Sequence, residues 1–507
     1  MNFITGLVYR VKAKYKPRTP TFRQELIDND IELSVRHLKQ FFKFGHGRSA
    51  FKTKAVHDVS FDIKKGECFG LVGESGCGKT TTGRSLIRLY NITSGSVYFE
   101  GRRTSAGSRW NEKEIKWTKI RGRKKIKELR KIEEDEVAKL QDTTGLIGKI
   151  EEINVQLSEI EQQMVDLKVE YKDRIKQYSN NVDDENEKAN KIEEINREYS
   201  SEAEVRKVKL ENLQAELKEL KKQVNEAKKA ELDDDTKAKI EEIRAKYSAE
   251  RKAIREHIDE VEKEQIEAIA QIKYDNRHVD KKLMSKMQMI FQDPVDSLDP
   301  RMTVEDIIQE GLHIQGQYNK YKNSQKVKDV LIKVGLLPEY ASRYPHEFSG
   351  GQRQRIGIAR ALVMNPQFLI CDEPISALDV SIRAQIINLL NDLKDEMGLT
   401  ILFIAHDLSV VKYFCDRIAV MYYGEIVELA TSDELFAHPL HPYTHALLSA
   451  IPKPDPLSEK KRTRYLYIPA NEHDYSKEAP KLVEITPGHW VLANSVELEK
   501  YKAQLKQ

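Results

Sequence analysis

The sequence predicts an α/β domain whose chain is interrupted near its middle by two antiparallel helices. Two short apolar runs, 68–72 and 368–371, have the length of buried strands, and each leads into residues that can carry chemistry. Between them, the stretch 110–283 is rich in charged and amide side chains and has single apolar residues at spacings of three and four. That spacing is typical of helices that pack along one seam.

Composition excludes several classes of protein. The 507 residues carry a net charge of only +3, so no global field favours nucleic acid. The four cysteines stand singly, which predicts a reducing compartment with neither a disulfide framework nor a thiolate metal site. We find no apolar run of about 18 residues and no signal peptide, so we expect a cytosolic chain with at most a peripheral membrane role.

The first 30 residues form a basic extension. Aromatic and aliphatic side chains alternate there with basic ones, among them Arg10, Lys12 and Lys14. Such a segment is suited to an anionic surface, although a solvated basic tail is the more common interpretation.

A glycine-rich loop follows the first apolar run. The pattern GxxxxGK[ST] is met by Gly73, Gly78, Lys79 and Thr80, and a helical pattern comes next. The glycines let backbone N–H groups converge on phosphate oxygens, and the helix N-terminus adds its positive end. Lys79 is expected to reach the β and γ phosphates of ATP, and the Thr80 hydroxyl to ligate Mg²⁺. The predicted nucleotide-binding residues here are Gly73, Glu74, Ser75, Gly76, Cys77, Gly78, Lys79, Thr80 and Thr81.

The second apolar run ends in two acids. A carboxylate just beyond a core strand can hold Mg²⁺, and a second one can orient or deprotonate an attacking water. We expect Asp372 to take the first role and Glu373 the second. A strand that ends in Asp-Glu is common by itself, so this prediction depends on the other motifs.

The segment "FSGGQRQRIGIARAL" (348–362) resembles the signature sequence of ATP-binding cassette (ABC) proteins. The resemblance implies a P-loop NTPase fold with a RecA-like core, an antiparallel β subdomain and a helical signature subdomain. It also implies that the signature residues serve the ATP of an opposing cassette. Those residues are Ser349, Gly350, Gly351 and Gln352.

Further positions match the family in its order. "ISALD" resembles the D-loop and places Asp379 at the dimer seam, and "FIAHDL" supplies His406 as the switch histidine. "MIFQDP" supplies Gln292, which in the family senses the γ-phosphate and Mg²⁺. Phe42 is the best match for the aromatic that stacks on adenine, with Phe41 as the alternative. A lone histidine after a strand is usually a core residue, and a lone loop glutamine is usually solvated. The order of all the motifs favours the family reading.

The segment "HPLHPYTHALLSAIPKPDP" (438–456) is similar to the C-terminal segment of peptide and nickel permease ATPases. Together with 348–362 it most resembles the F-type ATPase subunit of oligopeptide permeases. That resemblance implies a D-type ATPase subunit as heterodimer partner, two transmembrane permease subunits, and an indirect link to an extracytoplasmic peptide-binding protein. It places the chain on the cytoplasmic face of the membrane, with no direct peptide binding.

Three histidines in this segment, His438, His441 and His445, suggest a metal site, but no further ligand of suitable spacing follows them. The family segment explains them without metal. Since the segment contains no cysteine, we expect no iron–sulfur centre.

The long helical stretch separates two motifs that lie a few tens of residues apart in the family. Gln292 comes 213 residues after Lys79. Both ends of the stretch must return to neighbouring sites, so we expect an antiparallel coiled-coil hairpin with its apex at 178–186 and breaks near 142–148 and 231–236. The hairpin is either an arm that docks on a partner or an inert loop, since loop-closure entropy grows slowly with length.

The predicted domain organisation has five parts. The basic extension is 1–30, and the C-terminal extension is 436–507. The two halves of the ATPase domain are 31–109 and 284–435, and the insertion between them is 110–283. The leading function is an ATPase that powers oligopeptide import. The alternative is a coiled-coil ABC ATPase of DNA repair or chromosome maintenance. In that class the coil enters after the glutamine that Gln292 resembles, whereas here it enters before it.

Overall fold

The computed structural model describes residues 16–45, 51–140, 144–181, 185–227, 234–376, 378–451 and 465–505. The chain divides into two compact units. One is the span Ile115–Glu262, and the other combines Asn2–Glu114 with Lys263–Gln507. The first unit is therefore an insertion within the second.

A four-stranded antiparallel sheet lies at the start of the second unit. It has the order β2-β1-β4-β5. Leu33 and Val35 of β1 are fully buried in the same apolar cluster as Phe69 and Leu71, so this sheet packs against the larger one. Its strands are β1 (Ile31–Phe44), β2 (Phe51–Lys64), β4 (Ser94–Phe99) and β5 (Arg102–Ser108).

The larger sheet has eight strands in the order β11-β12-β10-β9-β3-β8-β7-β6. Its centre is parallel: β3 (Cys68–Val72) pairs with β8 (Thr400–Ala405) and β9 (Arg417–Tyr422), and β7 (Phe368–Asp372) pairs with β8 and β6 (Met287–Ile290). Every residue of β3, β7 and β8 is buried, as expected of parallel strands that are covered on both faces. The residues that follow β3, β6, β7 and β8 meet at one edge, because carboxyl ends of parallel strands lie together.

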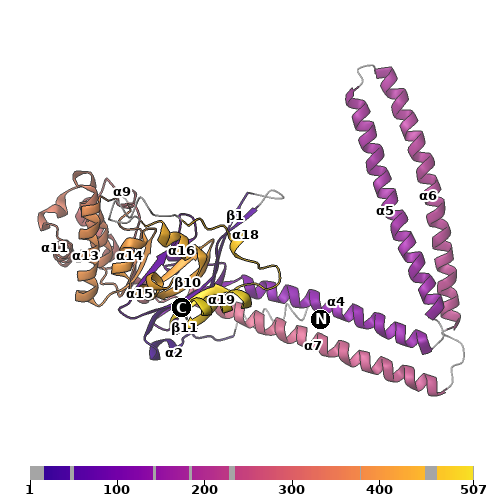
Figure 1. Ribbon diagram of the computed structural model, residues 1–507, viewed down its shortest axis with the longest axis horizontal. Coiled ribbons are helices and arrows are strands. Elements are labelled where there is room, and N and C mark those ends of the chain that lie inside the picture. Colours follow the sequence, from indigo (N-terminus) through magenta and orange to yellow (C-terminus); the bar gives the residue numbers. More distant parts are fainter. Residues whose placement is uncertain are drawn as a thin grey trace. The chain divides into compact units, whose positions relative to one another are not determined.

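Different elements cover the two faces of this sheet. Phe69 and Leu71 of β3 face α3 and the antiparallel sheet, whereas Cys68 and Val72 face a helical layer. Figure 1 shows α11 and α13 on the opposite side of this unit from β11 and α19. The longer helices are α3 (Lys79–Leu86), α10 (Val304–Ile314), α11 (Lys320–Lys333), α12 (Gly350–Leu362), α13 (Val380–Met397) and α16 (Pro442–Ser449). The shorter ones are α2 (Gln24–Asp28), α8 (Lys281–Ser285), α9 (Pro294–Ser297), η2 (Pro338–Ser342), η3 (Pro345–Glu347), α14 (Leu408–Phe414), α15 (Ser432–Ala437) and α18 (Pro469–Glu472).

The C-terminal extension continues the larger sheet. β11 (Lys481–Thr486) and β12 (His489–Ala493) form a hairpin, and β12 pairs with β10 (Glu425–Thr431). The last helix, α19 (Ser495–Gln504), places Tyr501 in a small apolar cluster with Val491 and Leu440. This end of the chain is therefore part of the second unit. No sequence motif had predicted this hairpin or this helix.

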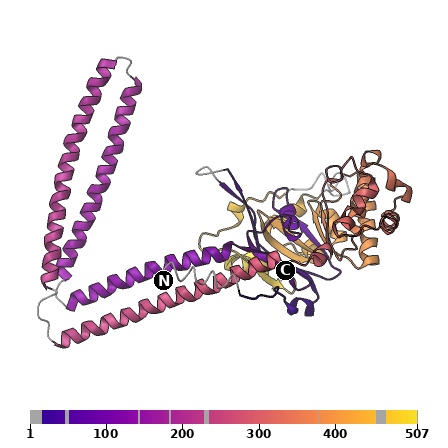
Figure 2. The same ribbon diagram turned by 180° about the vertical axis from the view of Figure 1, so that it is seen from behind.

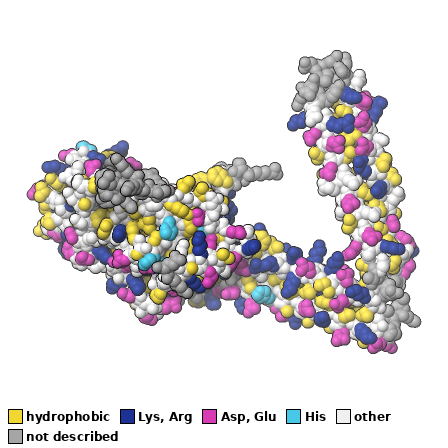
Figure 3. Space-filling view, in the orientation of Figure 1, with side chains coloured by type: hydrophobic (Ala, Val, Ile, Leu, Met, Phe, Trp, Pro, Cys, Tyr) yellow, Lys and Arg dark blue, Asp and Glu magenta, His cyan; other side chains and the backbone are white. Residues whose placement is uncertain are grey.

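The described residues of the insertion form four long helices. They are α4 (Arg109–Leu140), α5 (Thr144–Asn181), α6 (Glu185–Ala227) and α7 (Asp234–Arg277). Charged side chains of both signs are spread along them (Figure 3). The expected apex and both expected breaks overlap the junctions between these helices, but residues 144–148, 178–181, 185–186 and 234–236 of the expected segments are helical. Residues 141–143, 182–184 and 228–233 lie outside the described residues.

The helices pack as two antiparallel pairs (Figure 2). In the pair α5–α6, the Tyr171 hydroxyl donates to Glu202 at 3.0 Å, and Arg174 pairs with Glu198 at 3.0 Å. In the pair α4–α7, Lys119 donates to Glu262 at 2.6 Å. Gly122 allows α4 to approach α7 closely, because a Cβ there would lie 2.3 Å from Ile258.

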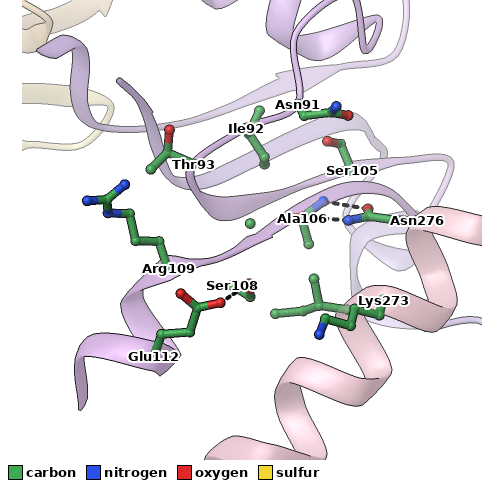
Figure 4. Close-up of a pocket in the computed structure, with 12 residues that line it drawn as sticks. Asn91, Ile92, Thr93, Ser105, Ala106, Ser108, Arg109, Glu112, Lys273 and Asn276 are labelled. Atoms are coloured by element: carbon green, nitrogen blue, oxygen red, sulfur yellow. Dashed lines mark hydrogen bonds between the residues drawn. The ribbon is translucent and has the colours of Figure 1, made fainter. Parts of the chain in front are cut away.

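Within the second unit, the end of α7 is fastened to the edge strand β5. The Asn276 side chain accepts the Ala106 N–H at 3.0 Å and donates to the Ala106 carbonyl at 2.7 Å (Figure 4). The buried Asp275 carboxylate accepts the Thr21 hydroxyl at 2.6 Å and the Arg103 Nε–H at 2.7 Å. Asn276 thus satisfies backbone groups that an edge strand leaves open. A cavity of about 390 Å³ lies beside it.

The described part of the predicted basic extension contacts the same helix end. Arg18 donates to Glu267 at 2.8 Å. The extension also reaches the β4–β5 turn, where the Arg23 backbone N–H donates to the Gly101 carbonyl at 2.8 Å. Residues 1–15 lie outside the described part of the chain. None of the helices in the described ranges has the length and apolarity that a bilayer crossing requires.

Candidate active site

The glycine-rich loop joins β3 to α3 at the carboxyl edge of the sheet. Gly73 and Gly78 have φ angles of 149° and 108°, which favour glycine. A Cβ at Gly73 would lie 2.2 Å from the Met421 carbonyl oxygen, and one at Gly78 would lie 2.3 Å from that of Ala55. Both glycines are therefore required by backbone conformation and by close packing.

Lys79 begins α3 and is buried. Its ammonium donates to the carbonyl oxygens of Gly73 at 2.7 Å and Glu74 at 2.9 Å. The cation is thus held by the loop itself, at the place where the sequence analysis expects phosphate to bind.

Thr80 and Asp372 have the chemistry of a divalent-cation site. The Thr80 hydroxyl donates to Asp372 Oδ1 at 2.8 Å. Asp372 is fully buried, and no described residue forms a hydrogen bond with its Oδ2, Arg84 lying 3.9 Å away. A buried carboxylate oxygen beside a hydroxyl provides the oxygen ligands that Mg²⁺ prefers, so these residues fit the ion. Burial raises the pKa of the Asp372 carboxyl above its usual value.

Glu373 lies one residue beyond β7 with a φ of 46°. Its Oε2 accepts the Gln292 side-chain amide at 2.9 Å and lies 3.2 Å from His406 Nδ1. Gln292 follows β6 and His406 follows β8, the two strands that flank β7. Three predicted catalytic residues thus meet at the ends of three adjacent strands.

A cavity of about 410 Å³ joins these groups to the loop. Its lining includes Ala55 of β2, a residue that no motif marks because alanine has no functional group. Its other lining residues are Ser75, Gly76, Gly78, Lys79, Thr80, Thr81, Gln292, Glu373 and His406.

The predicted signature residues do not line this cavity. Ser349 caps α12, where its hydroxyl accepts the Gln352 N–H at 3.4 Å and its own N–H donates to the Gln352 side chain at 3.0 Å. Gly350 is exposed, and a Cβ at Gly351 would lie 2.7 Å from Ile382. Asp379 is exposed at the start of α13. These residues are directed elsewhere than to the chain's own glycine-rich loop.

The predicted adenine contact also lies outside the cavity lining. The Phe42 ring packs edge-on against Tyr90, with centroids 5.2 Å apart, and Phe41 lies 6.3 Å from the His57 ring. Both phenylalanines are partly exposed. Stacking of Phe42 on adenine stays a prediction.

The three histidines of the C-terminal segment do not converge. His438 lies 3.3 Å from Glu434, while His441 is buried and caps α16 by accepting the Tyr443 N–H at 3.1 Å. Burial lowers the pKa of His441 to about 3. Among the described residues, no cluster of three or more His, Cys, Asp or Glu side chains is arranged to hold a metal ion.

Tyr443 is a contact of the glycine-rich loop that sequence reasoning missed. Its hydroxyl accepts the Glu74 backbone N–H at 3.0 Å. Because the partner is a backbone amide, no residue pattern predicts this contact. The one sequence signal was that Tyr443 belongs to the segment 438–456, which is similar to the C-terminal segment of peptide and nickel permease ATPases.

The parallel sheet, the glycine-rich loop and the acid pair at the carboxyl edge define a P-loop ATPase. The family model described as "ABC transporter" matches residues 56–221 and 256–376, more than half of the chain. The chain therefore belongs to the ABC transporter family. A second model, described as the C-terminal region of oligopeptide/dipeptide transporters, matches residues 427–477.

Two named relatives agree with this classification in their sequences. "Oligopeptide transport ATP-binding protein OppF" of Bacillus subtilis is 38% identical over 470 residues, which cover 92% of this chain and 98% of the relative. The protein of the same name from Streptococcus pyogenes serotype M1 is 57% identical over 227 residues, which cover 44% of this chain and 73% of the relative. The solved structure of cbiO1 from Clostridium perfringens, part of the ABC transporter complex cbiONQ, has a TM-score of 0.40 and 16% identity, covering 80% of this chain and 91% of that chain.

Proposed function

We propose that this chain is the ATP-hydrolysing subunit of an ABC transporter that imports oligopeptides, and that it acts at the cytoplasmic face of the cell membrane. The observation that carries this proposal is the convergence of Lys79, Glu373 and His406 on one cavity in a chain that also has the C-terminal region of oligopeptide/dipeptide transporters. The relatives named as oligopeptide transport ATP-binding proteins support the substrate class.

ATP binding is assigned to the glycine-rich loop. The loop's N–H groups and the N-terminus of α3 would receive the β and γ phosphates, and Lys79 would leave its carbonyl partners to meet them. Thr80 and Asp372 would hold Mg²⁺, with Gln292 as a further predicted ligand. When bound, the ion neutralises charge on the β and γ phosphate oxygens.

Hydrolysis is assigned to Glu373. Its carboxylate would orient the attacking water and accept its proton as the water attacks the γ-phosphorus in line with the leaving oxygen. Gln292 and His406 hold that carboxylate by the contacts at 2.9 Å and 3.2 Å. The chain's own contribution is therefore positioning, a base and positive charge.

Coupling requires a second cassette. The signature residues Ser349–Gln352 and Asp379 lie away from the chain's own site, which is the placement needed to complete the site of an opposing subunit. We assign that position to a D-type ATPase in a heterodimer that drives two transmembrane permease subunits. An extracytoplasmic binding protein would deliver the peptide, so this chain would contact neither peptide nor nucleic acid.

Transport by the full complex tests this proposal. In proteoliposomes that hold the permease, both ATPase subunits and the binding protein, labelled oligopeptide uptake should require ATP. Lys79→Ala should abolish uptake. The exposed Lys333→Ala on α11 is the matched control and should leave uptake unchanged. ATP-independent uptake, or ATPase activity stimulated by linear DNA instead of by the permease, would contradict the proposal and favour the DNA-repair alternative.

The inserted helices are assigned to a coiled-coil arm that docks on a partner of this complex. The proposal extends to the domain boundaries 31–109, 110–283, 284–435 and 436–507. Replacement of 115–262 by a short linker leaves Asp275 and Asn276 in place, so the ATPase unit should keep its basal ATP hydrolysis. Peptide uptake or complex assembly should fall. Full uptake with normal assembly would instead identify the arm as an inert loop.

A further inference from the structure

The C-terminal region reaches the glycine-rich loop through one hydroxyl group. Tyr443, the second residue of α16, is 1% exposed, and its hydroxyl accepts the Glu74 backbone N–H at 3.0 Å. Glu74 is the second residue of the loop. The region matched to oligopeptide/dipeptide transporters thus contacts the loop assigned to phosphate.

The contact acts on a peptide unit that Lys79 also holds. The Glu74 N–H belongs to the same planar peptide as the Gly73 carbonyl oxygen, which accepts the Lys79 ammonium at 2.7 Å. Tyr443 and Lys79 therefore fix opposite edges of one peptide. Gly73, with its φ of 149°, is the conformationally permissive residue beside it.

Tyr443 itself is rigidly placed. Its ring lies 4.4 Å from the Tyr422 ring and 5.5 Å from the Tyr467 ring, measured between centroids. His441 Nδ1 accepts the Tyr443 N–H at 3.1 Å. The buried Glu428 carboxylate accepts the backbone N–H groups of Leu440 at 2.8 Å and His441 at 3.0 Å. The segment that presents the hydroxyl is thus anchored to the β10 strand.

We propose that Tyr443 is a positioning residue of the ATP site, which holds the Gly73–Glu74 peptide in place when Lys79 leaves it for the phosphates. Once Lys79 has moved, the hydroxyl is the remaining side-chain contact shown here for that peptide. The C-terminal extension then contributes to nucleotide affinity as well as to the fold. The inference rests on the proposed assignment of the Gly73–Thr81 loop as the phosphate site.

Tyr443→Phe tests the proposal, because it removes the hydroxyl and keeps the ring. We expect affinity for ATP and for ADP to fall about threefold to tenfold, the range of one lost hydrogen bond, while kcat at saturating ATP changes less than twofold. Tyr467→Phe removes a hydroxyl from the same ring cluster and should leave both quantities unchanged. Unchanged affinity in Tyr443→Phe would overturn the proposal, whether or not the Tm of the variant is lower.

Hydrogen exchange of the nucleotide-free full chain gives a readout independent of activity. The Glu74 amide should exchange at least threefold faster in Tyr443→Phe than in the native chain or in Tyr467→Phe. Equal exchange would overturn the contact itself. If the native chain binds no ATP while the exchange effect is present, the loop assignment fails and the Tyr443 contact stands, so the two failures are distinguishable.

Discussion

The carboxylate of Glu373 and the side-chain amide of Gln292 are hydrogen-bonded at 2.9 Å, although the two residues belong to different strand ends. β6, which leads to Gln292, is the first strand after the long insertion, and it pairs in parallel with β7, which leads to Glu373. His406 approaches the same oxygen from the other side, at 3.2 Å. Because both neighbours contact the Glu373 carboxylate, replacing Glu373 tests the proposed catalytic role of this group directly.

Glu373→Gln should abolish turnover while ATP binding is retained. A glutamine keeps an acceptor oxygen for Gln292 but cannot accept a proton, and general-base catalysis typically contributes 10²–10⁴-fold. We therefore expect kcat to fall by at least about 100-fold, with ATP affinity changed less than threefold. Phosphate release and equilibrium ATP binding measure the two quantities. Hydrolysis at the native rate would remove Glu373 from this role.

Asp372→Asn should stabilise the nucleotide-free protein and impair its use of Mg²⁺. Burial raises the pKa of Asp372, so folding favours its protonated form. The resulting penalty on the charged form is absent at low pH and grows as pH rises through the folded-state pKa. The variant should thus raise Tm at pH 8 without Mg²⁺ and leave it nearly unchanged at pH 4. The Mg²⁺ concentration needed for half-maximal hydrolysis should increase. A lower Tm at pH 8 would contradict this account.

Gly73→Ala and Gly76→Ala separate backbone strain from steric conflict. Both glycines have positive φ, 149° and 82°, but a Cβ at Gly73 meets the Met421 oxygen at 2.2 Å while one at Gly76 has nothing within 4 Å. Overpacking typically costs about 1–3 kcal/mol, so Gly73→Ala should lose that much more unfolding free energy than Gly76→Ala. Urea denaturation measures the difference. Equal losses would show that the Met421 carbonyl can move aside.

His489→Gln should weaken the C-terminal hairpin more at low pH than at high pH. His489 Nε2 lies 2.8 Å from Glu428 in a buried pair. Burial alone would lower the pKa of His489, but the hydrogen bond to Glu428 raises it above the usual value. The stabilisation is then fully present below the unfolded-state pKa and is lost as pH rises through the folded-state pKa. The Tm difference between native and variant chains should be larger at pH 6 than at pH 9. A difference independent of pH would contradict a charged His489.

The predicted chemistry of the site depended on residues that parallel strands bring together. Gln292, Asp372, Glu373 and His406 lie at the ends of β6, β7 and β8 or within two residues of them, and Lys79 begins the helix that follows β3. A motif after an apolar run was therefore enough to place each residue. The helical insertion was likewise readable from its spacing.

Other parts of the structure depend on contacts that local pattern does not encode. The hairpin of β11 and β12 turns at Pro487-Gly488, but no sequence motif had predicted this segment, and the pairing of β12 with β10 joins residues that are distant in sequence. Tyr443 binds a backbone amide, which has no residue identity to read. Polar segments in the sequence predict where the helices of the insertion end. Which helix then packs against which depends on tertiary contacts that these segments do not encode.

The position of β3 in the middle of the larger sheet has a consequence for the order of synthesis. The Cys68 backbone N–H donates to Asp416, 348 residues further along, and both strands that flank β3 come from the same late part of the chain. On the ribosome, this apolar strand emerges long before its neighbours exist, whereas the inserted helices can form locally as they appear. The nascent chain must therefore keep an unpaired hydrophobic strand from aggregating. The larger sheet of the ATPase unit can be completed only near the end of translation.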